Sequence, residues 1–572
     1  MKLNKNLIYK KELIFKIFLL IFSFSINHYF GFQGFNFIDS FQHISGGQKV
    51  LNGEIPFKDY WISDSGPLMD FTQALLFKIF GSDWNILVLN ASLANIIFAF
   101  SVYWLCNIFK IEFNIKIIIS ILAAVIMYPA SGTPLIDFHS IIFSVLGFVM
   151  FIYFSKKNDY KKLTLVPIIY FIAFFFKQVP AAYFALIILI ISTYYFFNRK
   201  RYILYSQIVG TIIGFFISLT VFYFFDIKIL TVYEQYFLMP FFQLFERTTD
   251  NTIDTSFFST SQKIRYIILL IIPALITLYH HLTTKKKFDH ELKVNFFIII
   301  SLFLIGILHE SYTLNQSTTL GLLPLITIFL ILLSNIKNKK LEYSLYLINI
   351  VILIRLVKLD INYLFLVGFL LFSFSILSKK IINSYIIRNL IILYFVLTTI
   401  FYFDKLILNR KWQDIYNPNW KQDSLDASKI DSRLKGLRWI SNDPDTKNEF
   451  LIVKNNLNYL KTTNNEGEYI LITHYQIYNF ILNKKNLSPV KYWWKNASFP
   501  VENIFLKKKF DETFLLKIQK HNIKRIIVLK DVKIYKKFDI KDFDWLINCS
   551  ILDKKNSNNF REIYIIIKKC KI

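Results

Sequence analysis

Long apolar runs, separated by short charged or polar breaks, fill the first four hundred positions of the sequence. Many runs reach the roughly 20 residues that a helix needs to cross a bilayer, and others are short enough to be tilted or broken. The first run follows a basic start with no small-residue cleavage site after it, so we interpret it as a retained span. The pattern predicts about 13 transmembrane helices, near residues 11–30, 84–108, 115–130, 138–155, 163–176, 180–197, 202–225, 265–280, 295–308, 318–334, 343–357, 362–378 and 388–403.

The pattern changes after residue 403, where the chain becomes polar and rich in Asn and Lys. Three segments have the composition of buried strands and two have that of helices, namely 468–474, 523–530 and 562–569 for the strands and 447–463 and 512–521 for the helices. Strands separated by helices predict a small α/β domain. We therefore divide the chain into a transmembrane domain, 1–403, and a C-terminal α/β domain, 404–572.

Composition and charge support this division. The 572 residues are 54% hydrophobic, with a mean hydropathy of +0.41, which is typical of a membrane protein. The net charge of +28 could suggest nucleic acid, but the basic residues cluster in alternate loops between apolar runs, as cytoplasmic loops do. We expect no nucleic-acid partner. The expected protein crosses the inner or plasma membrane many times, with a cytoplasmic N-terminus and an extracytoplasmic C-terminal domain.

The first external loop, residues 31–83, places carboxylates directly after the first span. In the stretch "FIDSFQHISGGQKVLNGEIPFKDYWISDSGPLMDF", they are Asp39, Glu54, Asp59 and Asp64. The segment after Asp39 predicts a short helix on the membrane surface that stops at Asn52-Gly53. Asp39 with Gln42 also fits a helix N-cap with a capping box, and Asp59 fits a residue that stabilises a loop.

Several residues of this loop carry a resemblance to a known family. Asp39, Gly47, "LNGEIPFKDYW", Gly66-Pro67-Leu68 and "ALLFKIFG" resemble the first external loop of GT-C membrane glycosyltransferases. The similar members are bacterial relatives of dolichyl-phosphate-mannose protein mannosyltransferases and of the lipid A aminoarabinose transferase. The resemblance implies a sugar donor linked to a polyprenyl phosphate, with Asp39 as catalytic base and Asp59 as a substrate-binding residue. Many members have Asp-Glu where this chain has Asp39-Ser40.

Other polar residues of the expected external loops are candidates for substrate binding. Asp137 and His139 begin the fourth span, but two residues apart on a helix they do not share a face, so we expect at most one to act. Lys177 lies between two apolar runs, near the outer surface, where it could hold a phosphate or simply extend its charge to water. His309 and Glu310 lie at the outer end of a predicted hairpin.

Together these patterns predict a glycosyltransferase that moves a hexosyl or pentosyl group from a polyprenyl-phosphate donor to an envelope acceptor. A polysaccharide polymerase or ligase, a transporter of lipid-linked sugars and an assembly protein remain alternatives. A transporter should show inverted repeats and ionisable residues at mid-membrane. The acceptor stays open between protein, lipid A and glycan. We assign no cofactor and no metal ligands, and the need for a divalent metal stays open, as does pairing of Cys549 with Cys570.

Overall fold

The structure is a computed structural model of the chain. It describes residues 2–242, 396, 400 and 403–565, with gaps at 63–64, 198, 241, 401–402, 411–414, 416, 418, 442–444, 463–466, 530–539 and 557–559. The six spans predicted between 265 and 403 fall almost entirely outside the described residues, and so do Asp64, His309, Glu310 and Cys570.

Five of the described helices are long and apolar enough to cross a membrane, and the chain is a polytopic membrane protein. The spans predicted from the sequence in this region coincide with these helices or with shorter apolar ones. The long helices are α1 (Lys2–Phe30), α4 (Trp84–Ile108), α6 (Ile136–Lys157), α9 (Gln178–Phe197) and α10 (Arg201–Phe224), and the shorter ones are α5 (Phe113–Ile126) and α8 (Leu165–Phe176).

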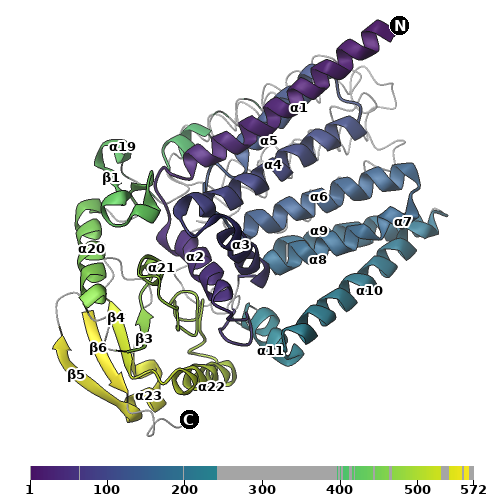
Figure 1. The fold of residues 1–572 in the computed structure, drawn as a ribbon. Coiled ribbons are helices and arrows are strands. Elements are labelled where there is room, and N and C mark those ends of the chain that lie inside the picture. The colour runs from purple at the N-terminus through teal and green to yellow at the C-terminus, as the bar shows by residue number, and fades with distance from the viewer. Residues whose placement is uncertain are drawn as a thin grey trace, which may run out of the picture.

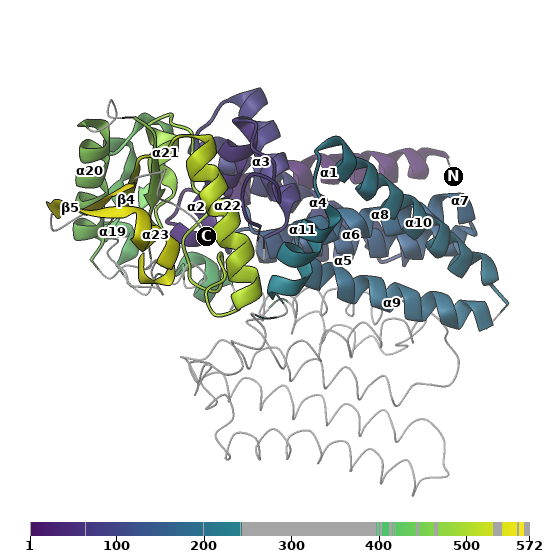
Figure 2. The same cartoon turned by 90° about the horizontal axis from the view of Figure 1, so that it is seen from below.

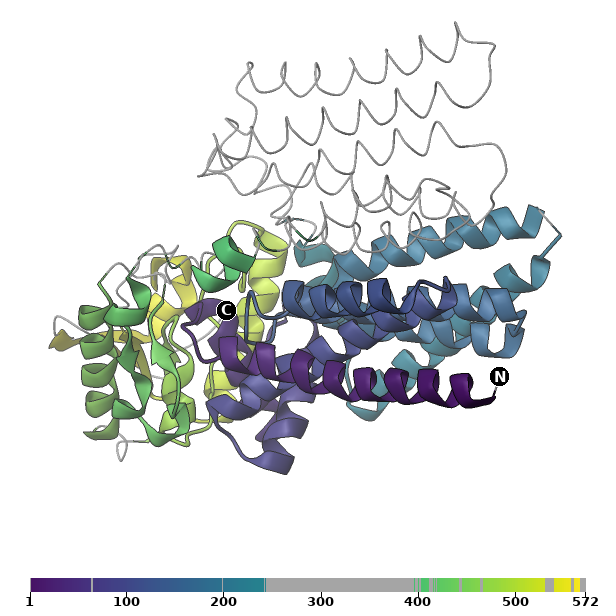
Figure 3. The ribbon, with the colours of Figure 1, turned by 90° about the horizontal axis from the view of Figure 1, so that it is seen from above.

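The helices run side by side, so the bundle has two distinct ends (Figure 1). The start of α1 and the short helix α7 (Tyr160–Leu163) lie at the end far from the C-terminal strands (Figures 1 and 3). The connections 109–112, 158–164 and 199–200 join helices at this far end. The second and third are basic, whereas the first carries both Lys110 and Glu112. At the opposite end lie α2 (Phe37–Leu51), α3 (Pro67–Phe80) and α11 (Ile229–Tyr233), the last followed by a π-helix at Glu234–Leu238.

The first loop folds into α2 and α3, and each boundary has a local cause. The side chain of Asn36 accepts hydrogen bonds from the backbone N–H groups of Ile38 and Asp39, so Asn36 is the N-cap of α2. The prediction that Asp39 caps this helix is therefore wrong, because Asp39 already lies within the first turn. The helix ends at Asn52, as predicted. Pro67 begins α3, where its missing N–H costs nothing.

Two glycines let α2 and α3 pack closely. A Cβ atom on Gly46 would lie 2.1 Å from Oδ1 of Asp70, and one on Gly47 would lie 2.8 Å from Cγ of Gln73. Both positions therefore require a residue without a side chain. Most of α2 is buried, in part by the C-terminal region, so it does not lie open on a membrane surface as the sequence suggested.

The C-terminal region contains a four-stranded mixed sheet in the order β3-β4-β6-β5. Strands β3 and β4 are parallel, with Ile470 opposite Ile526, and β6 is antiparallel to both β4 and β5. The three predicted strands are present, whereas β5 was missed. The strands are β3 (Tyr469–Ile472), β4 (Arg525–Leu529), β5 (Ser550–Asn556) and β6 (Phe560–Ile565); the helices are α20 (Thr446–Thr462), α21 (Ile477–Ile481), α22 (Ile504–Lys520) and α23 (Asp544–Cys549).

A second, smaller unit joins this region to the end of α1. It consists of α19 (Trp420–Asp423) and an antiparallel pair, β1 (Leu425–Asp426) and β2 (Arg438–Trp439). The backbone N–H of Arg438 donates to the carbonyl of Phe32, directly after α1. Seen from below, the start of α1 and the C-terminal strands lie at opposite ends of the molecule (Figure 2). The first loop, which follows α1, meets the C-terminal region where α2 packs against α21. Cys549 is disulfide-bonded, whereas Cys106 is free and buried.

Candidate active site

Asp39 lies half-buried in the first turn of α2, at the end of the bundle near the C-terminal sheet. Because the side chain of Asn36 caps the helix, the carboxylate of Asp39 is not used for capping. Asp39 therefore lies directly after the first span, as the sequence placed it, in a turn whose cap is supplied by another residue.

The loop 128–135, which leads into α6, contacts the first turn of α2. The hydroxyl oxygens of Ser40 and Thr133 lie 3.0 Å apart, within hydrogen-bond distance. The loop is held from the other side by the fully buried Arg410, which donates to the carbonyls of Pro129 at 3.1 Å and Ala130 at 3.3 Å. Arg410 was not predicted as a functional residue, because nothing in the sequence relates it to residues so far away.

The structure brings Asp137 and Lys177 together. Nζ of Lys177 lies 2.9 Å from Oδ2 of Asp137, and their side chains are 19% and 14% exposed. The hydroxyl of Ser140 donates to the carbonyl of Lys177 at 2.9 Å, which fixes the turn between α8 and α9 against α6. The N–H of Gly66 donates to the carbonyl of Phe176 at 3.0 Å, so the first loop packs against this same turn.

His139 lies away from this ion pair, in the core. It is buried, its Nδ1 bonds the hydroxyl of Tyr128, and its Nε2 lies 3.1 Å from Oδ1 of Asn90. Its ring also contacts that of Phe176, with centroids 4.8 Å apart. Asp137 and His139 thus have different surroundings, as their spacing predicted, and the satisfied ring of His139 suits a structural role.

Asp59 closes a turn of the first loop. Its carboxylate accepts from the N–H of Ile55 at 2.9 Å and from Nζ of Lys520 on α22 at 3.1 Å. Partial burial alone would raise the pKa of Asp59, but the hydrogen bond from Ile55 and the charge of Lys520 outweigh it, and the pKa is lowered. These contacts favour the loop-stabilising interpretation over direct substrate binding.

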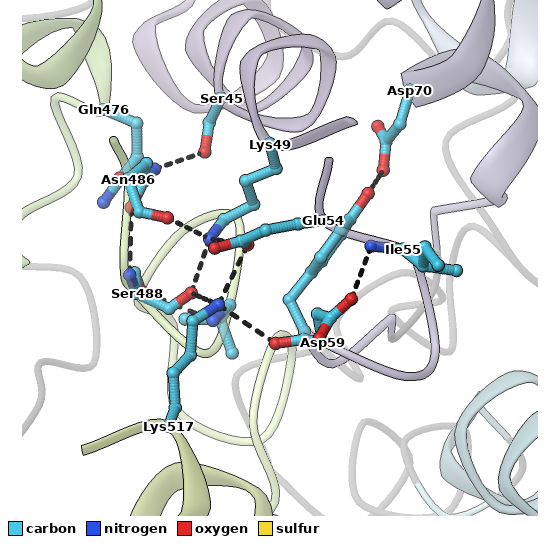
Figure 4. Close-up of polar contacts among 12 residues, drawn as sticks. Ser45, Lys49, Glu54, Ile55, Asp59, Asp70, Gln476, Asn486, Ser488 and Lys517 are labelled. Atoms are coloured by element: carbon cyan, nitrogen blue, oxygen red, sulfur yellow. Dashed lines mark hydrogen bonds and ion pairs between the residues drawn. The ribbon is translucent and has the colours of Figure 1, made fainter. Parts of the chain in front are cut away.

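A buried charge cluster joins the first loop to the C-terminal region (Figure 4). Oε2 of Glu54 lies 3.2 Å from Nζ of Lys49 and 2.9 Å from Nζ of Lys517, and all three side chains are nearly inaccessible. Both lysines also donate to the carbonyl of Ser488. Burial lowers the pKa of Lys49 to about 7, while the pKa of Glu54 lies below its usual value because the two lysines outweigh its burial.

A second buried pair lies on the other side of Tyr60. Nζ of Lys491 lies 3.1 Å from Oδ1 of Asp70, and the hydroxyl of Tyr60 donates to Oδ2 of Asp70 at 2.7 Å. Burial raises the pKa of Asp70, and Lys491 and Tyr60 compensate only in part. The sequence analysis did not predict Lys491, Tyr60 or Asp70 as site residues. The signals that could have indicated this region were the charged Asp70 inside an otherwise apolar helical segment, and the adjacent Gly46 and Gly47 inside another helix.

Among the residues that the structure describes, no three His, Cys, Asp or Glu side chains are grouped so that they could hold a metal ion.

Comparison with known proteins finds similarity among solved structures but not among sequence families. No protein-family model and no curated protein matches the sequence. Among solved structures, the chain is similar to ArnT from Cupriavidus metallidurans, crystallised with undecaprenyl phosphate; the match covers 98% of this chain and 99% of that one, with 9% identity and a TM-score of 0.42. ArnT is a lipid A aminoarabinose transferase, the type of enzyme that the first loop resembles. At this identity and TM-score, no residue role carries over to this chain.

Proposed function

We propose that this protein is a membrane glycosyltransferase that takes a sugar from a polyprenyl-phosphate donor and transfers it to an envelope acceptor at the extracytoplasmic face. The observation that carries the proposal is the gathering of complementary groups at one end of an apolar helix bundle. Asp39 and the Asp137–Lys177 ion pair belong to segments joined by the contact of Ser40 with Thr133.

The chemistry divides between a base and a cation. Asp39 takes the proton of an acceptor hydroxyl as its oxygen attacks the anomeric carbon, with inversion there. The bond from that carbon to the phosphate oxygen breaks, and Lys177 stabilises the negative charge that the leaving phosphate retains. Asp137 orients Lys177 through the ion pair. The polyprenyl chain stays among the apolar helices, which accounts for a site at the end of the bundle.

The orientation of the protein in the membrane follows from charge. The basic loops lie at the far end of the bundle, and the site lies at the other, so the positive-inside rule assigns the site to the extracytoplasmic side. The disulfide at Cys549 supports this, because disulfides persist outside the cytosol.

The test uses full-length protein in nanodiscs and a panel of radiolabelled undecaprenyl-phosphate hexoses and pentoses, with Asp39→Asn beside the wild type. We expect the wild type to bind and release one sugar, and Asp39→Asn to bind the same donor but to lose at least roughly a hundredfold in turnover, the usual contribution of a general base. Full activity of Asp39→Asn would rule out the assigned base. Release of no sugar by the wild type would refute the function.

A further inference from the structure

A buried histidine without a partner lies one helical turn beyond Asp39. His43 is fully buried, and within the described part of the chain neither ring nitrogen has a hydrogen-bond partner. Positions 39 and 43 are four apart on α2, so the two side chains lie on the same face of the helix. A buried polar group without a partner lowers stability, so the fold by itself gives no reason for a histidine here.

Lys491 lies near enough to His43 to act on it electrostatically, and Lys491 is itself paired with Asp70. The side chains of this pair are 2% and 0% exposed. Asp70 approaches α2 over Gly46, three residues after His43 in the helix. Burial, and then the nearby charges of Lys491 and His139, lower the pKa of His43 well below its usual value. The imidazole is therefore neutral at pH 7, with one nitrogen that donates and one that accepts.

The charges of this cluster point to a neutral ligand. Lys491 and Asp70 compensate each other, and the neutral imidazole adds no charge, so the cluster offers little net attraction to a phosphate. It offers donors and acceptors side by side, as hydroxyl groups require. One helical turn spans 5.4 Å, a distance that a sugar ring bonded at the anomeric carbon near Asp39 can bridge.

We propose that His43, together with the Lys491–Asp70 pair, forms the subsite that binds the hydroxyl groups of the donor sugar. The inference rests on the proposed transferase function and goes beyond it, since it identifies the residues that choose the sugar. It also gives the C-terminal region a direct part in the site, because Lys491 comes from the segment after β3.

The first experiment compares His43→Leu and His43→Gln with the wild type in nanodiscs, on the donor that the wild type uses. We expect His43→Leu to lower kcat/KM roughly tenfold or more, the usual effect of losing one or two hydrogen bonds to a substrate. Its thermal stability should stay equal or rise, because an unpartnered polar group is removed. His43→Gln, which keeps a donor and an acceptor, should recover much of the loss. Binding of undecaprenyl phosphate without a sugar should stay unchanged in both variants.

The matched control is Ser155→Ala near the far end of α6. Ser155 is also buried and its hydroxyl has no partner among the described residues, yet it lies far from the site. It should leave kcat/KM and the order of preference among donors unchanged.

A second variant tests the contribution of the C-terminal region. The double change Asp70→Asn with Lys491→Met removes both buried charges together, so neither is left uncompensated. We expect it to change the preference among sugar donors while undecaprenyl phosphate still binds. If the wild type transfers sugar but neither the His43 variants nor the double variant changes kcat/KM or donor preference, the subsite is refuted and the transferase function stands. If the wild type transfers no sugar, both fail.

Discussion

Lys177 illustrates how one charged residue can be both bound within the protein and available to a ligand. Its ion pair with Asp137 is short, yet both side chains keep some access to solvent, unlike the closed pair of Lys491 and Asp70. A partly exposed ion pair costs little desolvation and can be shared with an incoming phosphate.

Replacing Lys177 should therefore weaken donor binding more than it weakens the fold. We expect Lys177→Met to lower the affinity for undecaprenyl phosphate by roughly tenfold or more, since a hydrogen bond to a charged group contributes about 1.5–3 kcal/mol. Lys177→Arg should retain most of the affinity. Titration of wild type and variants with undecaprenyl phosphate, followed by tryptophan fluorescence, measures this effect. Equal affinities for wild type and Lys177→Met would exclude Lys177 from phosphate binding.

At the scale of residues, the sequence predicted Asp39, Asp137 and Lys177 as candidates, because each is a polar group beside an apolar run. It could not predict that Asn36 caps α2 or that Asp137 pairs with Lys177. The first depends on which side chain faces the free N–H groups, and the second on two helix ends that meet only in the folded bundle.

At the scale of elements, the contact of α2 and the following turn with α22 depends on one buried carboxylate. Glu54 holds Lys49 from α2 and Lys517 from α22, so its removal leaves two buried positive charges side by side. Removing one lysine instead leaves a balanced pair. The cost of a change here should thus depend strongly on which member is removed.

We expect Glu54→Gln to lower the free energy of unfolding by about 3–5 kcal/mol, the usual effect of breaking a buried ion pair. Lys49→Met should cost clearly less. As a control, Lys58→Met removes a solvent-exposed pair with Asp226 and should change the melting temperature little. Thermal unfolding of the three full-length variants in the same detergent decides the order; equal melting temperatures for Glu54→Gln and Lys58→Met would contradict it.

The same cluster should make stability depend on pH. The pKa of Lys49 is about 7 in the folded protein, compared with 10.5 for a lysine exposed to water, as in the unfolded chain. Between these two pH values Lys49 carries a proton in the unfolded chain but not in the folded protein. The free energy of unfolding therefore rises as the pH increases from about 7 towards about 10. Melting temperatures from pH 6 to pH 10 should rise more steeply for the wild type than for Lys49→Met, and parallel curves would show that Lys49 contributes no such term.

The elements themselves were largely predictable. The spans at 84–108, 138–155 and 202–225 were found within two residues at each end, because hydropathy and helix length are local properties. Strand β5 was missed, since "SILDKKN" is polar and its pairing with β6 comes from tertiary structure. The packing of α2 beneath the C-terminal region was also missed, because no sequence pattern in α2 indicates its partner.

At the scale of the whole molecule, the two ends of the helix bundle differ in charge and in cover. Basic connections lie at one end, and the acidic first loop, covered by the C-terminal region, lies at the other. This separation is consistent with the alternation of basic loops along the sequence, and the orientation itself stays a prediction.

A C-terminal fusion tests the orientation in cells. Alkaline phosphatase needs disulfides to become active, so when fused after Ile572 it should be active only if the C-terminal region is extracytoplasmic. A green fluorescent protein fused at the same position should stay dark, because it does not become fluorescent when exported. If the green fluorescent protein fusion is instead fluorescent and the phosphatase fusion is inactive, the C-terminal region, and the site beside it, lies on the cytoplasmic side.

The contact between Lys49 and the carbonyl of Asn486 joins residues 437 positions apart. During synthesis at about 5–20 residues per second, the first loop would emerge roughly 20–90 s before its partner segment. Throughout that interval Lys49 and Glu54 lack Lys517 and Ser488, the partners that complete the buried charge cluster. A chain truncated before residue 486 would therefore lack this cluster, and we expect it to insert into the membrane without the proposed transfer of sugar.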